Sequence, residues 1–200
     1  MKITIEHESA RKLGINHRLE TVNPSHDLVL DFSLEQQFFS SWCWAAIAAS
    51  LAKFYGTCGL NQQQVACTLL GIDARDLPDP PDNDHSCNCQ MTVDKSLALV
   101  GCYSHWSLGR PSFERIFLEI HAARLPCVRI EWFQGGAHYL VIKGVTAEGQ
   151  LLHIEDSLYG PAVLPYGDFP KGYRGTGAVW TETFWTAPDK INNNETSDHE

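Results

Sequence analysis

The chain has 200 residues, of which 44% are hydrophobic and 20% are charged, and its formal net charge is −9. These proportions are typical of one soluble globular domain, and the negative charge argues against nucleic acid or an anionic membrane as the main partner. No uninterrupted apolar run is long enough to span a bilayer, and the first twenty residues lack the basic flank and apolar core of a secretory signal. We therefore expect a cytoplasmic protein, or one exported without a classical signal peptide.

The chain divides into three expected segments. Residues 1–30 read as a lead-in whose one clear apolar run, "LVLDF", begins at Leu28. Residues 31–188 read as a single folded domain. Residues 189–200 contain the polar stretch "INNNETSDHE" and read as a disordered tail.

The first half of the domain has helical patterns. "WCWAAIAASLAKFY" is rich in alanine, the best helix former, and stops at Gly56. In "NQQQVACTLLG", Asn61 is a candidate N-cap with Gln64 three residues later, and Gly71 is a stop signal. "TVDKSLALVG" and "SFERIFLEIHAAR" read as two more helices, whereas the acidic, proline-rich residues 73–90 read as a long loop without structure.

From Pro126 onward the pattern changes to short strands. The runs "CVRIEWF", "AHYLVIKGV", "LLHIEDS", "AVLPY" and "AVWTETFW" favour strands, and turn signals such as "QGG" and "AEG" separate them. Helices followed by an antiparallel sheet predict an α+β fold.

One cysteine stands where a nucleophile is expected. Cys43 lies at the predicted start of the alanine-rich helix, where free N–H groups and the helix dipole favour a negative charge. The thiolate is the reactive form of cysteine, and an oxyanion formed by its attack needs hydrogen-bond donors. The backbone N–H of Cys43 and the carboxamide of Gln37, six residues earlier, are candidate donors.

A histidine and an aspartate can complete the chemistry. His138 follows the "QGG" turn at the start of an apolar strand, and Asp156 ends the next strand. If these strands pair through the "TAEGQ" turn, Asp156 returns beside His138 and can orient its ring. His153 is a rival base, but its place within "LLHIED" puts it on a sheet face. Asp156 as a mere turn cap is the alternative for that residue.

These stretches together carry a family resemblance. The "Q…WCWAA" block, "GGAHYLVIKGV" and "IEDSLYG" resemble the papain-like cysteine peptidases, with Cys, His and acid in the family's order. The bacterial branch typified by the AvrRpt protease is the most similar, and the resemblance covers about Gln37 to Gly160. It is more distantly similar to the double-glycine leader peptidases, which usually have Asp-Cys-Gly where this chain has Trp42-Cys43-Trp44.

The resemblance implies a papain-like α+β fold, with an N-terminal helical half against a C-terminal antiparallel half and the active site between them. It implies Cys43 as nucleophile, His138 as base, Asp156 as orienting acid and Gln37 as oxyanion donor. The implied activity is hydrolysis of a specific peptide or protein substrate through a thioacyl-enzyme, with no cofactor and no metal. It specifies no oligomeric state.

Two other functions compete with the peptidase. Transglutaminases and glutamine deamidases use the same triad order on side-chain amides, and a silent papain-like module would bind peptides without turnover. The glutamine before Cys43 favours the peptidase.

The remaining cysteines and tryptophans leave alternatives open. Trp42 and Trp44 are candidate substrate-binding residues, with core packing as the alternative. A group of cysteines beside His85 could bind zinc or form a disulfide such as Cys67 to Cys89, but the Cys-x-Cys spacing is unusual for zinc and free thiols are favoured without a signal peptide; the group is Cys58, Cys67, Cys87 and Cys89.

Overall fold

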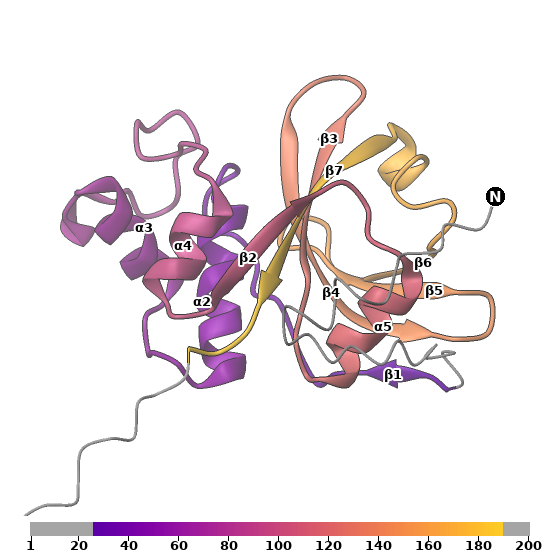
Figure 1. The fold of residues 1–200 in the computed structure, drawn as a ribbon. Coiled ribbons are helices and arrows are strands. Elements are labelled where there is room, and N and C mark those ends of the chain that lie inside the picture. The colour runs from indigo at the N-terminus through magenta and orange to yellow at the C-terminus, as the bar shows by residue number, and fades with distance from the viewer. Residues whose placement is uncertain (1–25, 190–200) are drawn as a thin grey trace, which may run out of the picture.

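A computed structural model describes residues 26–189 of the chain. Most of the predicted lead-in, residues 1–25, and nearly all of the predicted tail, residues 190–200, lie outside the described residues. The described part is α+β: helices α2, α3 and α4 gather on one side and the sheet lies on the other (Figure 1). The helices are α2 (Cys43–Tyr55), α3 (Gln62–Leu70), α4 (Val93–Leu99) and α5 (Phe113–His121), with short 3-10 helices η1 (Ala74–Asp76) and η2 (Tyr173–Gly175).

The predicted helix ends are confirmed by their backbone geometry. Helix α2 ends at Gly56, which has a left-handed φ of 68° that glycine adopts without strain. Helix α3 begins with a capping box in which the side chains of Asn61 and Gln64 each accept from the other residue's backbone N–H. Gly71 ends it, again with a positive φ. These signals act within a few residues, so the sequence alone reveals them.

Between residues 26 and 189, seven antiparallel strands form one sheet. Its order is β2-β7-β3-β4-β5-β6, and β1 pairs with β4. The strands are β1 (Leu28–Val29), β2 (Tyr103–Leu108), β3 (Cys127–Trp132), β4 (Ala137–Thr146), β5 (Leu151–Glu155), β6 (Ala162–Pro165) and β7 (Ala178–Thr186). All five strands predicted after Pro126 are present.

Two strands come from before Pro126. The first lies in the apolar run of the lead-in, which we expect to contain a short strand, whereas the second is not predicted. Strand β1 pairs with Gly144 and Val145 of β4, and Gly144 permits this approach because a Cβ there would lie 2.8 Å from the Leu28 carbonyl oxygen. Strand β2 pairs with β7. Its side chains are mostly exposed, so the sequence lacks the alternation that marks a half-buried strand.

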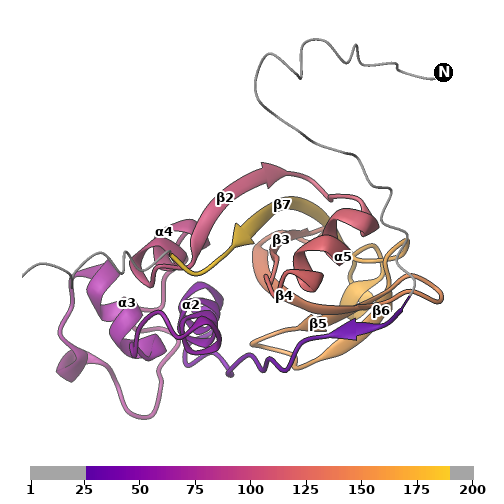
Figure 2. The same ribbon diagram turned by 60° about the horizontal axis from the view of Figure 1, so that its bottom comes forward.

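Helix α5 belongs to the sheet side of the molecule. Its buried residues recur at helical spacing and pack against β4 and β1. Figure 2 shows α5 against the strands, away from α2, α3 and α4. The helical half therefore consists of three helices, not the four that chain order predicts.

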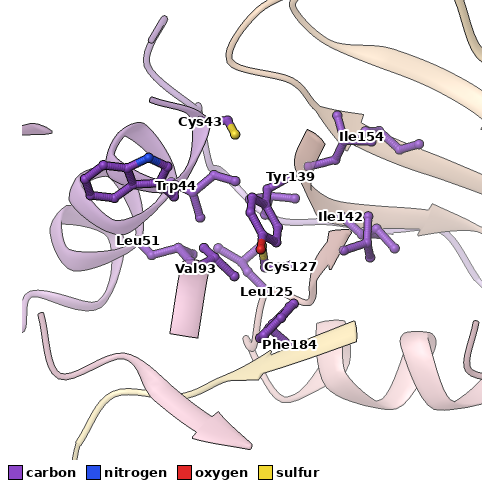
Figure 3. Close-up of a cluster of buried hydrophobic side chains, with 14 of the residues drawn as sticks. Cys43, Trp44, Leu51, Val93, Leu125, Cys127, Tyr139, Ile142, Ile154 and Phe184 are labelled. Carbon is purple, nitrogen blue, oxygen red and sulfur yellow. The ribbon is translucent and has the colours of Figure 1, made fainter. Parts of the chain in front are cut away.

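The core lies between α2 and the sheet. Figure 3 shows Tyr139 between the two, with Ile142 and Ile154 on the sheet side and Cys43 at the edge of the cluster. The helical half and the sheet therefore share one core, and Cys43 lies where that core reaches the surface. Within residues 26–189, none of the helices combines the length and apolar character that crossing a membrane needs.

Candidate active site

Cys43 is the first residue of α2, and its side chain lies near the surface of the core. Its N–H has no acceptor within the helix because the first turn lacks preceding carbonyls. The turn before it is closed by a hydrogen bond from Trp42 N to the Phe39 carbonyl, 3.0 Å. The Trp42 carbonyl then accepts from Ala46 N at 3.1 Å and starts the helix. Helix start and turn together fix the position of the thiol, which is 7% exposed.

His138 and Asp156 form a buried pair beside this cysteine. Strands β4 and β5 pair with Val141 opposite Glu155, so Asp156, the next residue, lies close to His138. The distance between His138 Nε2 and Asp156 Oδ1 is 2.8 Å. Because Nε2 is engaged, Nδ1 is the nitrogen left to face Cys43, which lies close enough to the ring to raise its pKa. The structure thus brings the three predicted residues together.

The pKa of His138 reflects this environment. Burial disfavours the imidazolium, but hydrogen bonds to Asp156 and Cys43 and their negative charges favour it more, and they raise the pKa from 6.5 to about 9. At neutral pH the ring is therefore an imidazolium, with a proton on each nitrogen. A protonated imidazole beside a thiol is the arrangement that stabilises a thiolate.

His138 is not the only hydrogen-bond partner of Asp156. Its Oδ1 also accepts from the N–H groups of Leu158 at 2.7 Å and Tyr159 at 3.0 Å, so it caps the following turn as well as facing the histidine. Its Oδ2 accepts from the Tyr173 hydroxyl at 2.7 Å. Burial alone would raise the pKa of the Asp156 carboxyl, but the bonds from His138, Tyr173 and Leu158 lower it below its usual value.

Tyr173 was not predicted as a site residue. It lies in η2, 17 positions after Asp156, and is 4% exposed. Its ring stacks on Trp132, with centroids 5.8 Å apart and planes 8° from parallel. The stretch "GYRG" carries no local signal for this contact, because only the packing of η2 against β3 brings Tyr173 to Asp156.

Gln37 is buried next to the turn before Cys43, but its donors are occupied. Its Nε2 donates to the carbonyls of Phe39 at 3.0 Å and Ser40 at 2.6 Å. Its Oε1 accepts from the Ser157 hydroxyl at 2.8 Å. Gln37 therefore links the nucleophile turn to the residue after Asp156. Its role as an oxyanion donor stays a prediction.

The two tryptophans beside Cys43 have no exposed surface. Trp42 packs edge-on against Phe39, with ring centroids 4.6 Å apart. The indole N–H of Trp42 donates to the Cys87 carbonyl at 2.9 Å and that of Trp44 to the Cys89 carbonyl at 3.1 Å. For Trp42 this is core packing. Trp44 also reaches the wall of a cavity.

The long loop before α4 is ordered by the nucleophile turn, contrary to the prediction that it lacks structure. Asn88 Oδ1 accepts from Ser41 N at 2.8 Å, and Asn83 Oδ1 accepts from Ser40 N at 2.9 Å. These side chains satisfy backbone donors that neither helix nor strand reaches. The loop thus supports the residues immediately before Cys43.

A cavity of about 360 Å³ opens beside Cys43. It lies between the helical half and the sheet, and is lined by Ser41, Cys43, Trp44, Gln90, Met91, Thr92, Lys95, Arg129, Ala137 and Tyr139. Two of these residues, Cys43 and Trp44, belong to the predicted site. The cavity is large enough for a peptide side chain to lie next to the thiol.

The other candidate groups do not join the site. His153 bonds to Thr146 Oγ1 at 2.9 Å on the sheet. All seven cysteines are free thiols, and His85 Nδ1 lies 2.9 Å from Cys87 Sγ. Between residues 26 and 189, no group of three or more His, Cys, Asp or Glu side chains is arranged to hold a metal ion.

Comparison with known proteins identifies the fold. No protein-family model matches the sequence, and no curated protein matches it. A crystal structure of a C39-like peptidase from Bacillus anthracis is similar with a TM-score of 0.51 and 11% identity, over 82% of this chain and 99% of that chain. A double glycine motif protease from an AMS/PCAT transporter, in complex with the leader peptide, gives a TM-score of 0.42 and 20% identity over 80% of this chain and 99% of that chain. The likeness to the Bacillus anthracis structure confirms the predicted fold class: the chain has an α+β, papain-like fold.

Proposed function

We propose that the chain is a cysteine peptidase that hydrolyses a specific peptide or protein through a thioacyl-enzyme. The observation that carries the proposal is the buried His138–Asp156 hydrogen bond, with Cys43, at the first turn of a helix, close enough to the ring to raise its pKa. The fold similarity to a C39-like peptidase supports it. So does the resemblance of the Trp42–Cys43–Trp44 block to the AvrRpt branch, to which we assign the chain as part of the proposal.

In the proposed mechanism, the Cys43 thiolate attacks the substrate carbonyl carbon and forms a C–S bond. The Cys43 N–H, free of helical partners, donates to the oxyanion. His138 gives its Nδ1 proton to the leaving amine as the C–N bond breaks. The same nitrogen then takes a proton from water, whose oxygen attacks the thioester; the C–S bond breaks, the acid is released, and the Cys43 thiolate and His138 imidazolium are restored.

Gln37 can donate to the oxyanion only if one of its present hydrogen bonds breaks. Because its carboxamide donates to Phe39 and Ser40 in the substrate-free chain, the oxyanion has to replace one of these bonds. Asp156 keeps the His138 ring oriented, since Nε2 is held while Nδ1 exchanges the proton.

Peptide cleavage tests the proposal. We would incubate the wild type and Cys43→Ala with a peptide pool of mixed sequence and identify new termini by mass spectrometry. Cys58→Ala, which removes a half-buried free thiol elsewhere, is the matched control. The proposal predicts cleavage by wild type and Cys58→Ala only. Incorporation of an added amine into glutamine side chains, without peptide cleavage, would assign the chain to the transglutaminase type instead.

A further inference from the structure

A second cavity lies on the His138 side of the candidate site. It has a volume of about 410 Å³ and is lined by Trp132, Gln134, Gly135, Tyr159, Arg174 and Thr176. Gly135 belongs to the turn that leads into β4, shortly before His138. The Tyr159 ring meets the His138 ring edge-on, with centroids 6.4 Å apart. The Tyr159 ring therefore lies both in the wall of this cavity and against the histidine.

A smaller cavity of about 240 Å³ shares wall residues with this cavity and with the one beside Cys43. It shares Trp132 and Gly135 with the cavity at Arg174. It shares Gln90, Arg129 and Ala137 with the cavity at Cys43. The three cavities are therefore neighbours along the residues that lead into the strand of His138, with Cys43 in the wall of the first and Arg174 in the wall of the last.

Arg174 brings an uncompensated positive charge to the last of these cavities. Among the arginines of the described segment, Arg75, Arg115, Arg124 and Arg129 form ion pairs with carboxylates. Within the same segment, no carboxylate pairs with Arg174. Its Nη2 donates to the carbonyls of Tyr159 at 3.0 Å and Gly160 at 3.3 Å.

The backbone and the aromatic neighbours hold this guanidinium in place. Arg174 has a φ of 53°, in the left-handed region that residues with a side chain rarely adopt. Such a conformation persists where surrounding contacts enforce it, and it is common at functional sites. The guanidinium carbon lies 5.0 Å from the Tyr159 ring centre and 5.1 Å from that of Tyr173. Two carbonyls and two rings thus orient one charge beside an open cavity.

We propose that Arg174 binds a carboxylate of the substrate on the leaving-group side of the cleaved bond. This inference rests on the proposed peptidase function, in which His138 protonates the leaving amine and the leaving segment lies on its side. A planar, fixed guanidinium suits a carboxylate because it offers several donors in one plane. The carboxylate can belong to an acidic side chain or to the free C-terminus of the substrate.

Interception of the thioacyl-enzyme by added amines tests this subsite directly. An acylated glycine 4-nitrophenyl ester acylates Cys43, and a dipeptide amine then competes with water for the thioester from the leaving-group side. In that step a C–N bond forms, the C–S bond breaks, and the amine proton passes to His138 and then to the thiolate. The ratio of aminolysis to hydrolysis product measures binding of the amine.

Three nucleophiles separate the two sources of the carboxylate. Glycyl-glutamate amide carries a side-chain carboxylate, glycyl-glutamine carries only a free C-terminal carboxylate, and glycyl-glutamine amide carries neither. We expect the ratio of aminolysis to hydrolysis to be about tenfold higher with one or both acidic dipeptides than with the neutral one, as for a hydrogen bond to a charged group. Cys43→Ala gives the uncatalysed background.

Matched variants assign the preference to Arg174. Arg174→Asn removes the charge with a residue that tolerates a positive φ, and Arg174→Gly serves if that variant fails to fold. Arg110→Gln is the control, because Arg110 also donates to backbone carbonyls and lies 4.5 Å from a tyrosine ring, that of Tyr166, without an ion pair. We expect the preference to disappear in the Arg174 variants and to survive in Arg110→Gln, and we expect hydrolysis to be unchanged in Arg110→Gln.

The outcomes are distinct. Equal partition of the three dipeptides in an enzyme that does form the acyl adduct overturns this inference and leaves the peptidase proposal standing. A preference that survives in the Arg174 variants overturns it too. Absence of any acyl adduct on Cys43 overturns the peptidase proposal, and the inference with it.

Discussion

The Tyr173 hydroxyl donates to Oδ2 of Asp156 at 2.7 Å, while Oδ1 of the same carboxylate faces His138 at 2.8 Å. Each oxygen of Asp156 thus has its own partner, so the carboxylate cannot rotate without losing a bond on both sides. A buried charge is tolerated when its hydrogen-bonding capacity is filled in this way.

Tyr173→Phe should weaken this arrangement without disturbing the aromatic packing. Loss of a hydrogen bond to a buried carboxylate lowers the free energy of unfolding by about 1.5–3 kcal/mol. Tyr166→Phe is the control, because the Tyr166 hydroxyl donates a hydrogen bond of 2.7 Å to the neutral Pro111 carbonyl. We expect this variant to lose about 1 kcal/mol of unfolding free energy. Urea unfolding at pH 7 measures both, and equal losses would contradict a special role for the carboxylate.

Tyr173→Phe should also change how the free energy of unfolding depends on pH in acid. The pKa of Asp156 is lowered in the folded chain, partly by Tyr173. Its contribution to stability is therefore present above the unfolded pKa and lost as pH falls through the folded pKa. Without Tyr173's hydroxyl the folded pKa rises toward the usual value, so Tyr173→Phe should lose less stability on acidification than the wild type. Urea midpoints between pH 7 and pH 2 test this, and parallel curves would contradict it.

The raised pKa of His138 predicts an alkaline limit for peptide cleavage. Because the folded pKa is about 9 and the usual one is 6.5, the contribution of the imidazolium to stability is complete below 6.5 and is lost as pH rises through about 9. The proton that the leaving amine needs is lost over the same range. We expect kcat/KM for an amide substrate to fall above about pH 9, whereas alkylation by iodoacetamide, which needs no proton donor, should not.

Asp156→Asn tests whether His138 sets this alkaline limit of peptide cleavage. It removes the hydrogen-bonded charge that favours the imidazolium, so the alkaline limit should move to lower pH. An unchanged limit in Asp156→Asn would show that another group titrates.

Gln37→Ala tests the predicted oxyanion donor against its neighbour. Removal of an oxyanion-hole donor typically lowers kcat by about 10²–10³, and we expect this loss with little change in KM. Gln36→Ala, at the exposed adjacent position, should leave kcat unchanged. A fall in stability in Gln37→Ala without a fall in kcat would assign Gln37 to the turn alone, through its bonds to Phe39, Ser40 and Ser157.

Asn88→Ala tests the support that the long loop gives the nucleophile turn. The change leaves the half-buried Ser41 N–H without its acceptor, at a cost of about 1 kcal/mol, the low end of the range for an unsatisfied donor. We expect lower stability together with lower kcat, measured by urea unfolding and peptide cleavage. Asn61→Ala removes a helix cap whose side chain bonds to Gln64 and to none of the site residues; it should cost about 1 kcal/mol with kcat unchanged.

The sequence reveals what depends on neighbouring residues. The stop of α2 at Gly56 and the capping box of α3 follow from residues within one turn. The pairing of His138 with Asp156 follows from two strands joined by a short turn, since antiparallel neighbours return the chain to the same place.

The sequence does not reveal contacts that depend on long-range packing. Tyr173 reaches Asp156 only when η2 packs against Trp132. Strand β2 forms because β7 offers it an edge, although its own side chains face solvent. From the sequence alone, Trp42 could face either a substrate or the core. Its contacts with Phe39 and Cys87 assign it to the core.

The most direct test of the central claim is intact-mass labelling by a peptidyl epoxide at neutral pH. Wild type, Cys43→Ala and His138→Ala would be compared under identical conditions. An activated Cys43–His138 pair predicts a single adduct on the wild type, none on Cys43→Ala and greatly slowed labelling of His138→Ala. Equal labelling of several cysteines, unaffected by His138→Ala, would contradict the claim.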